Sequence, residues 1–320
     1  MACQWDLKSP IKLYVIFSSF FGMCPFSIET SEKVTVRLSK LKLAYGIILS
    51  IIMIGSEINY YYDPDNDIYT YNIGFALFST IFYPSLHVAT FGSFLISSKR
   101  FIRIVNEIFN YTPLISNKNF YSKFFWIILM EILIMEILVT IASVGFAIGE
   151  YEINPTFNTL LKETFTYFVS NAEAVLHLWH CNLLILLKEI FAGVNKDLEE
   201  IKPDMAFFLE GKYKFLKWRK SDSWLVNKKK ENIHLLSLIF TYNHLIDIST
   251  GLNKCFNVAA VAVTFTTILE VLISINDEIN IADGVGLLLS WLAFVILQEY
   301  FILFSCEIVT SEVSVFFKFL

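Results

Sequence analysis

The sequence predicts an all-α protein, a bundle of six membrane-spanning helices with its N-terminus in the cytoplasm. Its composition, the length of its apolar segments and the charges of its loops all point to this fold class. Apolar residues make up 55% of the chain, charged residues make up 17%, and the mean hydropathy is +0.57. A soluble domain contains about 45–50% apolar and about 25% charged residues. One core cannot bury this excess, so we expect the apolar surface to face lipid.

Six apolar segments are long enough to cross a bilayer. Crossing about 30 Å of hydrocarbon takes about 20 helical residues, because each residue advances the helix by about 1.5 Å. Each span has to be a helix, since the backbone finds no water in lipid and no segment shows the alternating pattern of a barrel strand. The predicted spans are Leu41–Tyr62, Ile73–Ile96, Phe124–Ile148, Phe157–Leu187, Phe256–Ile275 and Val285–Ile308.

An apolar stretch before these spans, Ile11–Ile28, is interpreted as a membrane-skimming or re-entrant helix. Two serines interrupt it, and Gly22–Pro25 has the composition of a turn. If this stretch crossed the membrane, the basic segment Lys33–Lys42 would lie outside the cell. Lysine and arginine collect in cytoplasmic loops, so the charge pattern opposes a crossing here.

The loop charges also predict the orientation. With the N-terminus inside, 24 of the 25 lysine and arginine residues are cytoplasmic, and only Lys162 lies near the outer face. The outer loops contain only acidic charges: Asp63, Asp65, Asp67, Glu150, Glu152, Asp277, Glu278 and Asp283. We therefore expect a multi-pass protein of the cell membrane. The glycosylation sequon Asn110–Thr112 then lies in the cytoplasm and should be silent.

The long cytoplasmic loop Lys188–Lys254 is the largest polar region. Apolar residues at helical spacing within it predict that the fourth and fifth spans extend below the membrane. Its segment Lys212–Lys230 holds eight basic residues and one acidic residue. This pattern suits an anionic-lipid or calmodulin-type site, although the positive-inside rule alone explains it and is favoured. Nucleic-acid binding is not expected of a loop held between two spans.

Ionisable residues inside the spans are site hypotheses, because a charge in lipid is costly. Glu173, His177 and His180 share one helix face at i, i+4 and i+7. A metal site could use this spacing, but hydrogen bonds between helices or a water-filled vestibule are favoured, so no metal or cofactor is predicted. No hydrolase, metalloprotease or nucleotide-binding motif is present, and an enzyme is not predicted.

Aromatic residues are frequent in the outer halves of the predicted spans. An aromatic cavity with a few polar groups is typical of a site for a small organic ligand. The candidate ligand-binding residues are Tyr83, Tyr167, Phe168, Glu270 and Trp291. For any one aromatic residue the alternative is contact with lipid or a neighbouring helix, because the chain contains 31 phenylalanines.

Three stretches together resemble the insect gustatory receptor family. They are FFGMCPFSIE at Phe20–Glu29, the segment Ile233–Phe265 that leads into the fifth span, and Trp291–Glu312 with Cys306 and Glu312 near its end. With the cytoplasmic N-terminus and the long loop after the fourth span, the resemblance extends over nearly the whole chain.

The resemblance implies a function and an assembly. Members of that family are seven-helix ligand-gated cation channels of chemosensory neurons, which assemble as homo- or hetero-tetramers in membrane lipid and bind tastants in their outer half. Their seventh helix lines the pore and carries a TYxxxxxQF-type motif. The present sequence has no such motif and ends about a dozen residues after the sixth predicted span. The expectation is an incomplete gene model or splice form, or a product that binds ligand without conducting.

Two other classes of membrane protein were weighed. A polytopic transporter would show internal repeats with paired broken helices, and the two halves of this chain do not match convincingly. A G-protein-coupled receptor requires an extracellular N-terminus, which the loop charges oppose.

Overall fold

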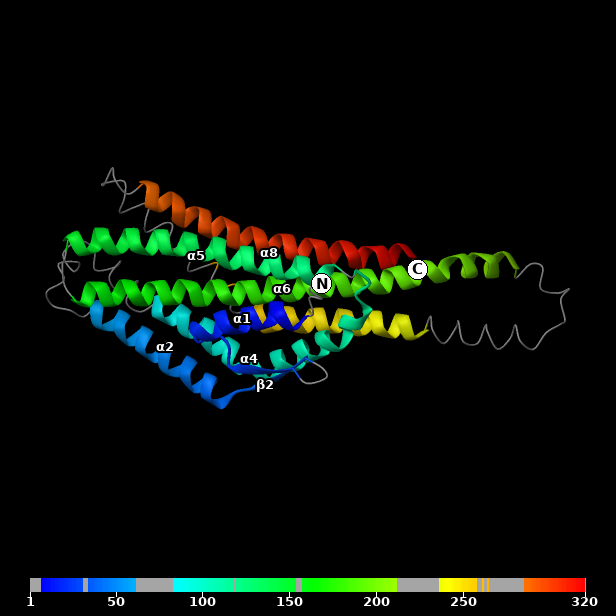
Figure 1. Cartoon of the computed structure of the whole chain (residues 1–320), viewed down its shortest axis with the longest axis horizontal. Coiled ribbons are helices and arrows are strands. Elements are labelled where there is room, and N and C mark those ends of the chain that lie inside the picture. Colours follow the sequence, from blue (N-terminus) through cyan, green and yellow to red (C-terminus); the bar gives the residue numbers. More distant parts are fainter. Residues whose placement is uncertain are drawn as a thin grey trace, which may run out of the picture.

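The computed structural model describes residues 7–30, 34–61, 83–117, 119–153, 157–211, 236–257, 261, 264 and 285–319 (Figure 1). Within these ranges the chain forms α-helices, one 3-10 turn and a two-stranded sheet. The helices are α1 (Lys8–Phe20), α2 (Lys40–Tyr61), α4 (Tyr83–Tyr111), α5 (Phe120–Ile153), α6 (Phe157–Gly211), the segment 236–257 and α8 (Val285–Phe319). The predicted all-α class is confirmed, with the small sheet as an addition.

The described helices coincide closely with the predicted apolar segments. Helix α2 matches the first segment to within one residue at each end, and α5 and α8 contain the third and the sixth. Parts of the second and fifth segments, 73–82 and most of 258–275, lie outside the described residues. By length and composition, Phe120–Gly145 and Tyr167–Glu200 are the stretches of the described chain that could cross a membrane.

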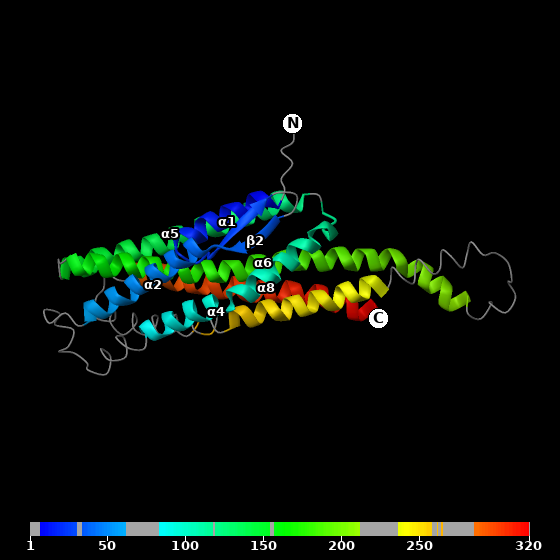
Figure 2. The same cartoon turned by 90° about the horizontal axis from the view of Figure 1, so that it is seen from below.

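Helix α6 runs through the centre of the bundle. It is one continuous helix of 55 residues, about 80 Å long, so the predicted extension of the fourth span is observed. The remaining helices lie around it, with α1 and the sheet on one side and α4, 236–257 and α8 on the other (Figure 2). Every residue of Val169–Leu184 is buried, which is the pattern of a helix enclosed on all faces.

The N-terminal helix α1 is attached to α6 by two hydrogen bonds. The hydroxyl of Tyr14 donates to the backbone oxygen of Val175 at 2.5 Å, and the indole Nε1 of Trp179 donates to Ser18 Oγ at 3.0 Å. The rings of Tyr14 and Trp179 also meet edge to face, with centroids 4.5 Å apart. The segment is therefore an integral part of the bundle.

The predicted helix over Ile11–Ile28 was wrong beyond Phe20. The chain turns at Gly22, whose φ of 74° is in the left-handed region that favours glycine. After Pro25 it forms strand β1 (Phe26–Thr30), which pairs antiparallel with β2 (Val34–Leu38). Alternating β-branched residues favour strands, and these runs are too short to show in a search for long spans.

A side chain of α4 extends this small sheet. The N–H of Val36 donates to Asn106 Oδ1 at 2.7 Å, and Asn106 Nδ2 donates to the oxygen of Val36 at 3.0 Å. The amide of Asn106 thus pairs with β2 as a residue of a third strand would. These two bonds attach the hairpin to α4.

The turn after α1 also approaches α2 closely. The hydroxyl of Tyr45 donates to the backbone oxygen of Phe20 at 2.9 Å. Gly46 lies directly against Gly22, and a Cβ built on Gly46 would collide with the carbonyl oxygen of Gly22. Since the obstacle is backbone, it cannot move aside as a flexible side chain could.

We expect Gly46→Ala to destabilise the protein by about 1–3 kcal/mol, because the added methyl group forces α1 and α2 apart. Gly55→Ala is the matched control on the same helix, where an added Cβ meets no atom within 4 Å. The control should melt at the wild-type temperature or slightly above it, since alanine favours helix. Thermal unfolding in lipid nanodiscs measures both, and equal melting temperatures would contradict the close approach.

Candidate functional site

The structure describes the side chains of two of the five candidate ligand-binding residues. Tyr167 and Phe168 are consecutive residues of α6, and both are half-buried. Tyr83 begins α4 and Trp291 lies near the start of α8, where only the backbone is described. Glu270 lies outside the described residues. Tyr167 and Phe168 are neighbours because they are consecutive in the chain, and their proximity to the other three residues remains a prediction.

Tyr167 forms a hydrogen bond with an acidic residue of the neighbouring helix. Its hydroxyl donates to Glu136 Oε2 of α5 at 2.8 Å. Glu136 is half-buried and stands at the middle of the predicted span Phe124–Ile148. Within the described ranges, no lysine or arginine forms an ion pair with this carboxylate. The site therefore contains an acidic group whose hydrogen-bond donor is a neutral hydroxyl.

Aromatic rings from the end of α1 pack against Tyr167 and Phe168. The ring of Phe21 lies 5.6 Å from that of Phe168 and 6.2 Å from that of Tyr167, centroid to centroid. Phe20 lies 5.6 Å from Phe168. We call Phe20, Phe21, Tyr167 and Phe168 the aromatic cluster. The sequence placed the first two before the first span, and no local signal indicated that they would meet α6.

The polar face of α6 makes interhelical contacts of the kind expected. His180 Nε2 lies 2.9 Å from Asn253 Oδ1, and its ring stacks on Phe256 at 4.9 Å. Both ring nitrogens of His177 are buried and have no hydrogen-bond partner in the part of the chain that the structure describes. In the same part, no three His, Cys, Asp or Glu side chains are grouped so that they could hold a metal ion.

A second acidic residue of α5 is held differently from Glu136. Glu131 is only 5% exposed, and its Oε2 accepts a hydrogen bond of 2.8 Å from Asn182 Nδ2. The same amide also donates to the backbone oxygen of Leu178 at 2.9 Å. Glu131 is thus enclosed between α5 and α6 and has a structural role, whereas Glu136 is partly accessible.

Polar contacts join the C-terminal halves of α6 and α8 to the start of the segment 236–257. Asn195 Nδ2 donates to the backbone oxygen of Glu312 at 3.0 Å. The hydroxyl of Tyr242 donates to the backbone oxygen of Val313 at 2.8 Å. Burial and the nearby Glu312 carboxylate raise the pKa of Tyr242, so its hydroxyl stays protonated and can donate. The sequence pointed to Glu312 but missed Asn195 and Tyr242, whose partners are distant in sequence.

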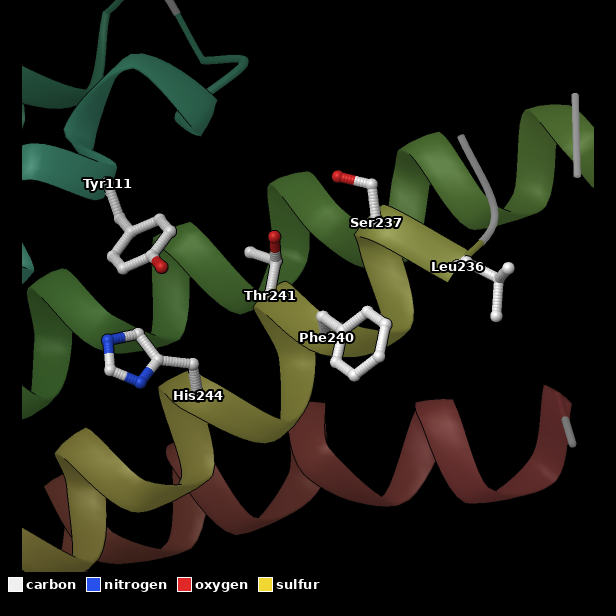
Figure 3. Close-up of a pocket in the computed structure, with 6 residues that line it drawn as sticks. All are labelled: Tyr111, Leu236, Ser237, Phe240, Thr241 and His244. Atoms are coloured by element: carbon white, nitrogen blue, oxygen red, sulfur yellow. The ribbon is translucent and has the colours of Figure 1, made fainter. Parts of the chain in front are cut away.

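An open groove of about 640 Å³ lies on the segment 236–257 (Figure 3). It is lined by Tyr111 of α4 and by Leu236, Ser237, Phe240, Thr241 and His244. His244 Nε2 lies 3.8 Å from Glu107 Oε2. Burial and the Glu107 carboxylate raise the pKa of Tyr111. The groove belongs to the loop region and shares no residue with the candidate ligand site.

We expect Asn182→Leu to destabilise the bundle by about 1–3 kcal/mol, because it removes the hydrogen-bond donor of the buried Glu131. Glu131→Gln is the control, since a neutral amide can still pair with Asn182. Both variants can be compared with the wild type by thermal unfolding in nanodiscs. A wild-type melting temperature for Asn182→Leu would show that Glu131 has another partner.

Comparisons with known proteins find one family and a similar structure. The family model described as 7tm chemosensory receptor matches residues 11–319. Among solved structures, the insect olfactory receptor OR5 from Machilis hrabei is similar, with a TM-score of 0.66 and 13% sequence identity over 96% of this chain and 81% of that chain. At this identity the structural similarity shows the fold alone. No curated protein sequence matches the chain.

Proposed function

The chain belongs to the 7tm chemosensory receptor family, and from this premise we propose that it is a gustatory receptor subunit of a ligand-gated cation channel. Family membership makes it a multi-pass membrane chemoreceptor and not an enzyme. The observation that carries the proposal is the extent of the family match, which includes the bundle and the candidate ligand site. The stretches Phe20–Glu29, Ile233–Phe265 and Trp291–Glu312 support the gustatory branch.

The proposed ligand is a small tastant that binds in the outer half of the bundle. The proposed contacts are Tyr83, Tyr167, Phe168, Glu270 and Trp291. Tyr167 and Phe168 support this site because they combine half-buried aromatic surface with a polar partner, Glu136. Mostly apolar linings with a few placed polar groups are typical of small-molecule sites.

The proposed topology has six spans, a cytoplasmic N-terminus and a re-entrant α1. Helix α1 has 13 residues and is about 20 Å long, so it is too short for about 30 Å of hydrocarbon. Its exposed face carries Lys12, Ile16 and Phe20 at i, i+4 and i+8, so the charge lies at one end and the apolar groups follow. This order suits a helix that enters the membrane from the cytoplasmic side. Subunits would assemble as homo- or hetero-tetramers within the lipid.

The topology predicts that an epitope on the N-terminus binds antibody only after the cells are permeabilised. It also predicts that glycosidase treatment leaves the electrophoretic mobility unchanged, because Asn110 faces the cytoplasm. Labelling of the epitope on intact cells would reverse the orientation.

The receptor proposal predicts a tastant-evoked cation current in cells that express the chain together with other gustatory receptor subunits. Phe168→Ala should raise the half-maximal ligand concentration at least about tenfold, because it removes an aromatic contact. Phe240→Ala is the control, since this exposed ring lies on the helical segment 236–257 and is not among the proposed ligand contacts. Whole-cell recording with matched surface expression measures both, and equal shifts would place the ligand elsewhere.

A further inference from the structure

We propose that the ligand site around Tyr167 recognises an organic ammonium ion, with Glu136 as its counter-ion. The inference rests on the proposed function for the claim that this site binds tastants. It adds the chemical class of the ligand and a contact residue, Glu136, that is not among the five candidates.

Glu136 is an acidic residue that a cationic ligand could pair with. The residue stands at the middle of a predicted span, and among the described residues it accepts a hydrogen bond from the neutral hydroxyl of Tyr167. An ionised carboxylate in hydrocarbon is costly unless a cation or a network of donors compensates it. Among the described residues no lysine or arginine pairs with it. A cation supplied by a ligand would provide this compensation.

The comparison with Glu131 shows why Glu136 is the accessible acid. Glu131 is 5% exposed and is held by Asn182, so it is closed to a ligand. Glu136 is half-buried, and its bonding partner Tyr167 is half-buried as well. Both acids contact α6, but only Glu136 does so through a half-buried aromatic residue, Tyr167.

The aromatic cluster supplies rings beside the hydrogen-bond partner of Glu136. The face of an aromatic ring attracts a cation that lies within about 6 Å of the ring centroid. Phe21 and Phe168 lie 6.2 Å and 5.9 Å from the ring of Tyr167, which itself bonds Glu136. A carboxylate whose hydrogen-bond partner packs among aromatic rings suits a large, weakly hydrated cation. A metal ion would require several oxygen or nitrogen ligands, and no such group occurs in the described residues.

The test uses the full chain in phosphatidylcholine nanodiscs with radiolabelled benzyltrimethylammonium as the probe. Neopentylbenzene, which replaces the ammonium group by a neutral carbon of the same shape, is the competitor control. We expect saturable binding of the probe that neopentylbenzene does not displace. Glu136→Gln should weaken binding at least about tenfold, as the loss of a counter-ion does in a poorly hydrated site. Phe168→Leu should weaken it about two- to fivefold.

Glu131→Gln is the matched control, because it neutralises an acid of the same helix outside the site, and its affinity should equal that of the wild type. Absence of saturable binding to the wild type, equal affinity in Glu136→Gln, or displacement by neopentylbenzene overturns the proposal. If Glu136→Gln does not fold, the wild-type protein alone tests the proposal, by binding the ammonium probe in the presence of neopentylbenzene. Tastant currents without ammonium binding would support the receptor function and reject the ammonium ligand class. Ammonium binding without tastant currents would support the ligand class and count against the channel function.

Discussion

The enclosure of α6 is the constraint on which the rest of the structure depends. From Val169 to Leu184 the helix has no exposed residue, yet this stretch includes asparagines, histidines and an acidic residue. A buried polar group without a hydrogen bond costs about 1–3 kcal/mol, and lipid cannot supply the partner. The neighbouring helices therefore have to present polar groups at matching heights along α6.

Several of these polar groups find partners on different elements, whereas the ring of His177 has none among the described residues. Helix α1 bonds Trp179 through Ser18, and α5 bonds Asn182 through Glu131. The segment 236–257 offers Asn253 to His180, while the backbone oxygen of Glu312 in α8 accepts a hydrogen bond from Asn195. Polar pairs of this kind help to specify which helix lies beside which, because a shift of one turn leaves both partners unpaired.

Much of the fold could be predicted from the sequence, because the lipid bilayer restricts which segments can lie in it. Hydrocarbon imposes a minimum span length, and the membrane imposes a charge asymmetry, and both are properties of local sequence. The same rules do not predict short helices and strands. The extent of α1, the hairpin at Phe26–Leu38 and the role of Asn106 depend on one glycine, one proline and a distant amide.

The candidate site shows where sequence reasoning ended. Tyr167 and Phe168 could be selected because aromatic residues in an outer half-span are recognisable in the sequence. Their partners Glu136 and Phe21 lie 31 and 147 positions away from Tyr167 and Phe168, and no spacing rule connects them. The sequence alone determined the helical class, the apolar segments and the predicted orientation, because these follow from local composition. Only the tertiary structure decided which polar groups meet, because a hydrogen bond depends on the packing of whole helices.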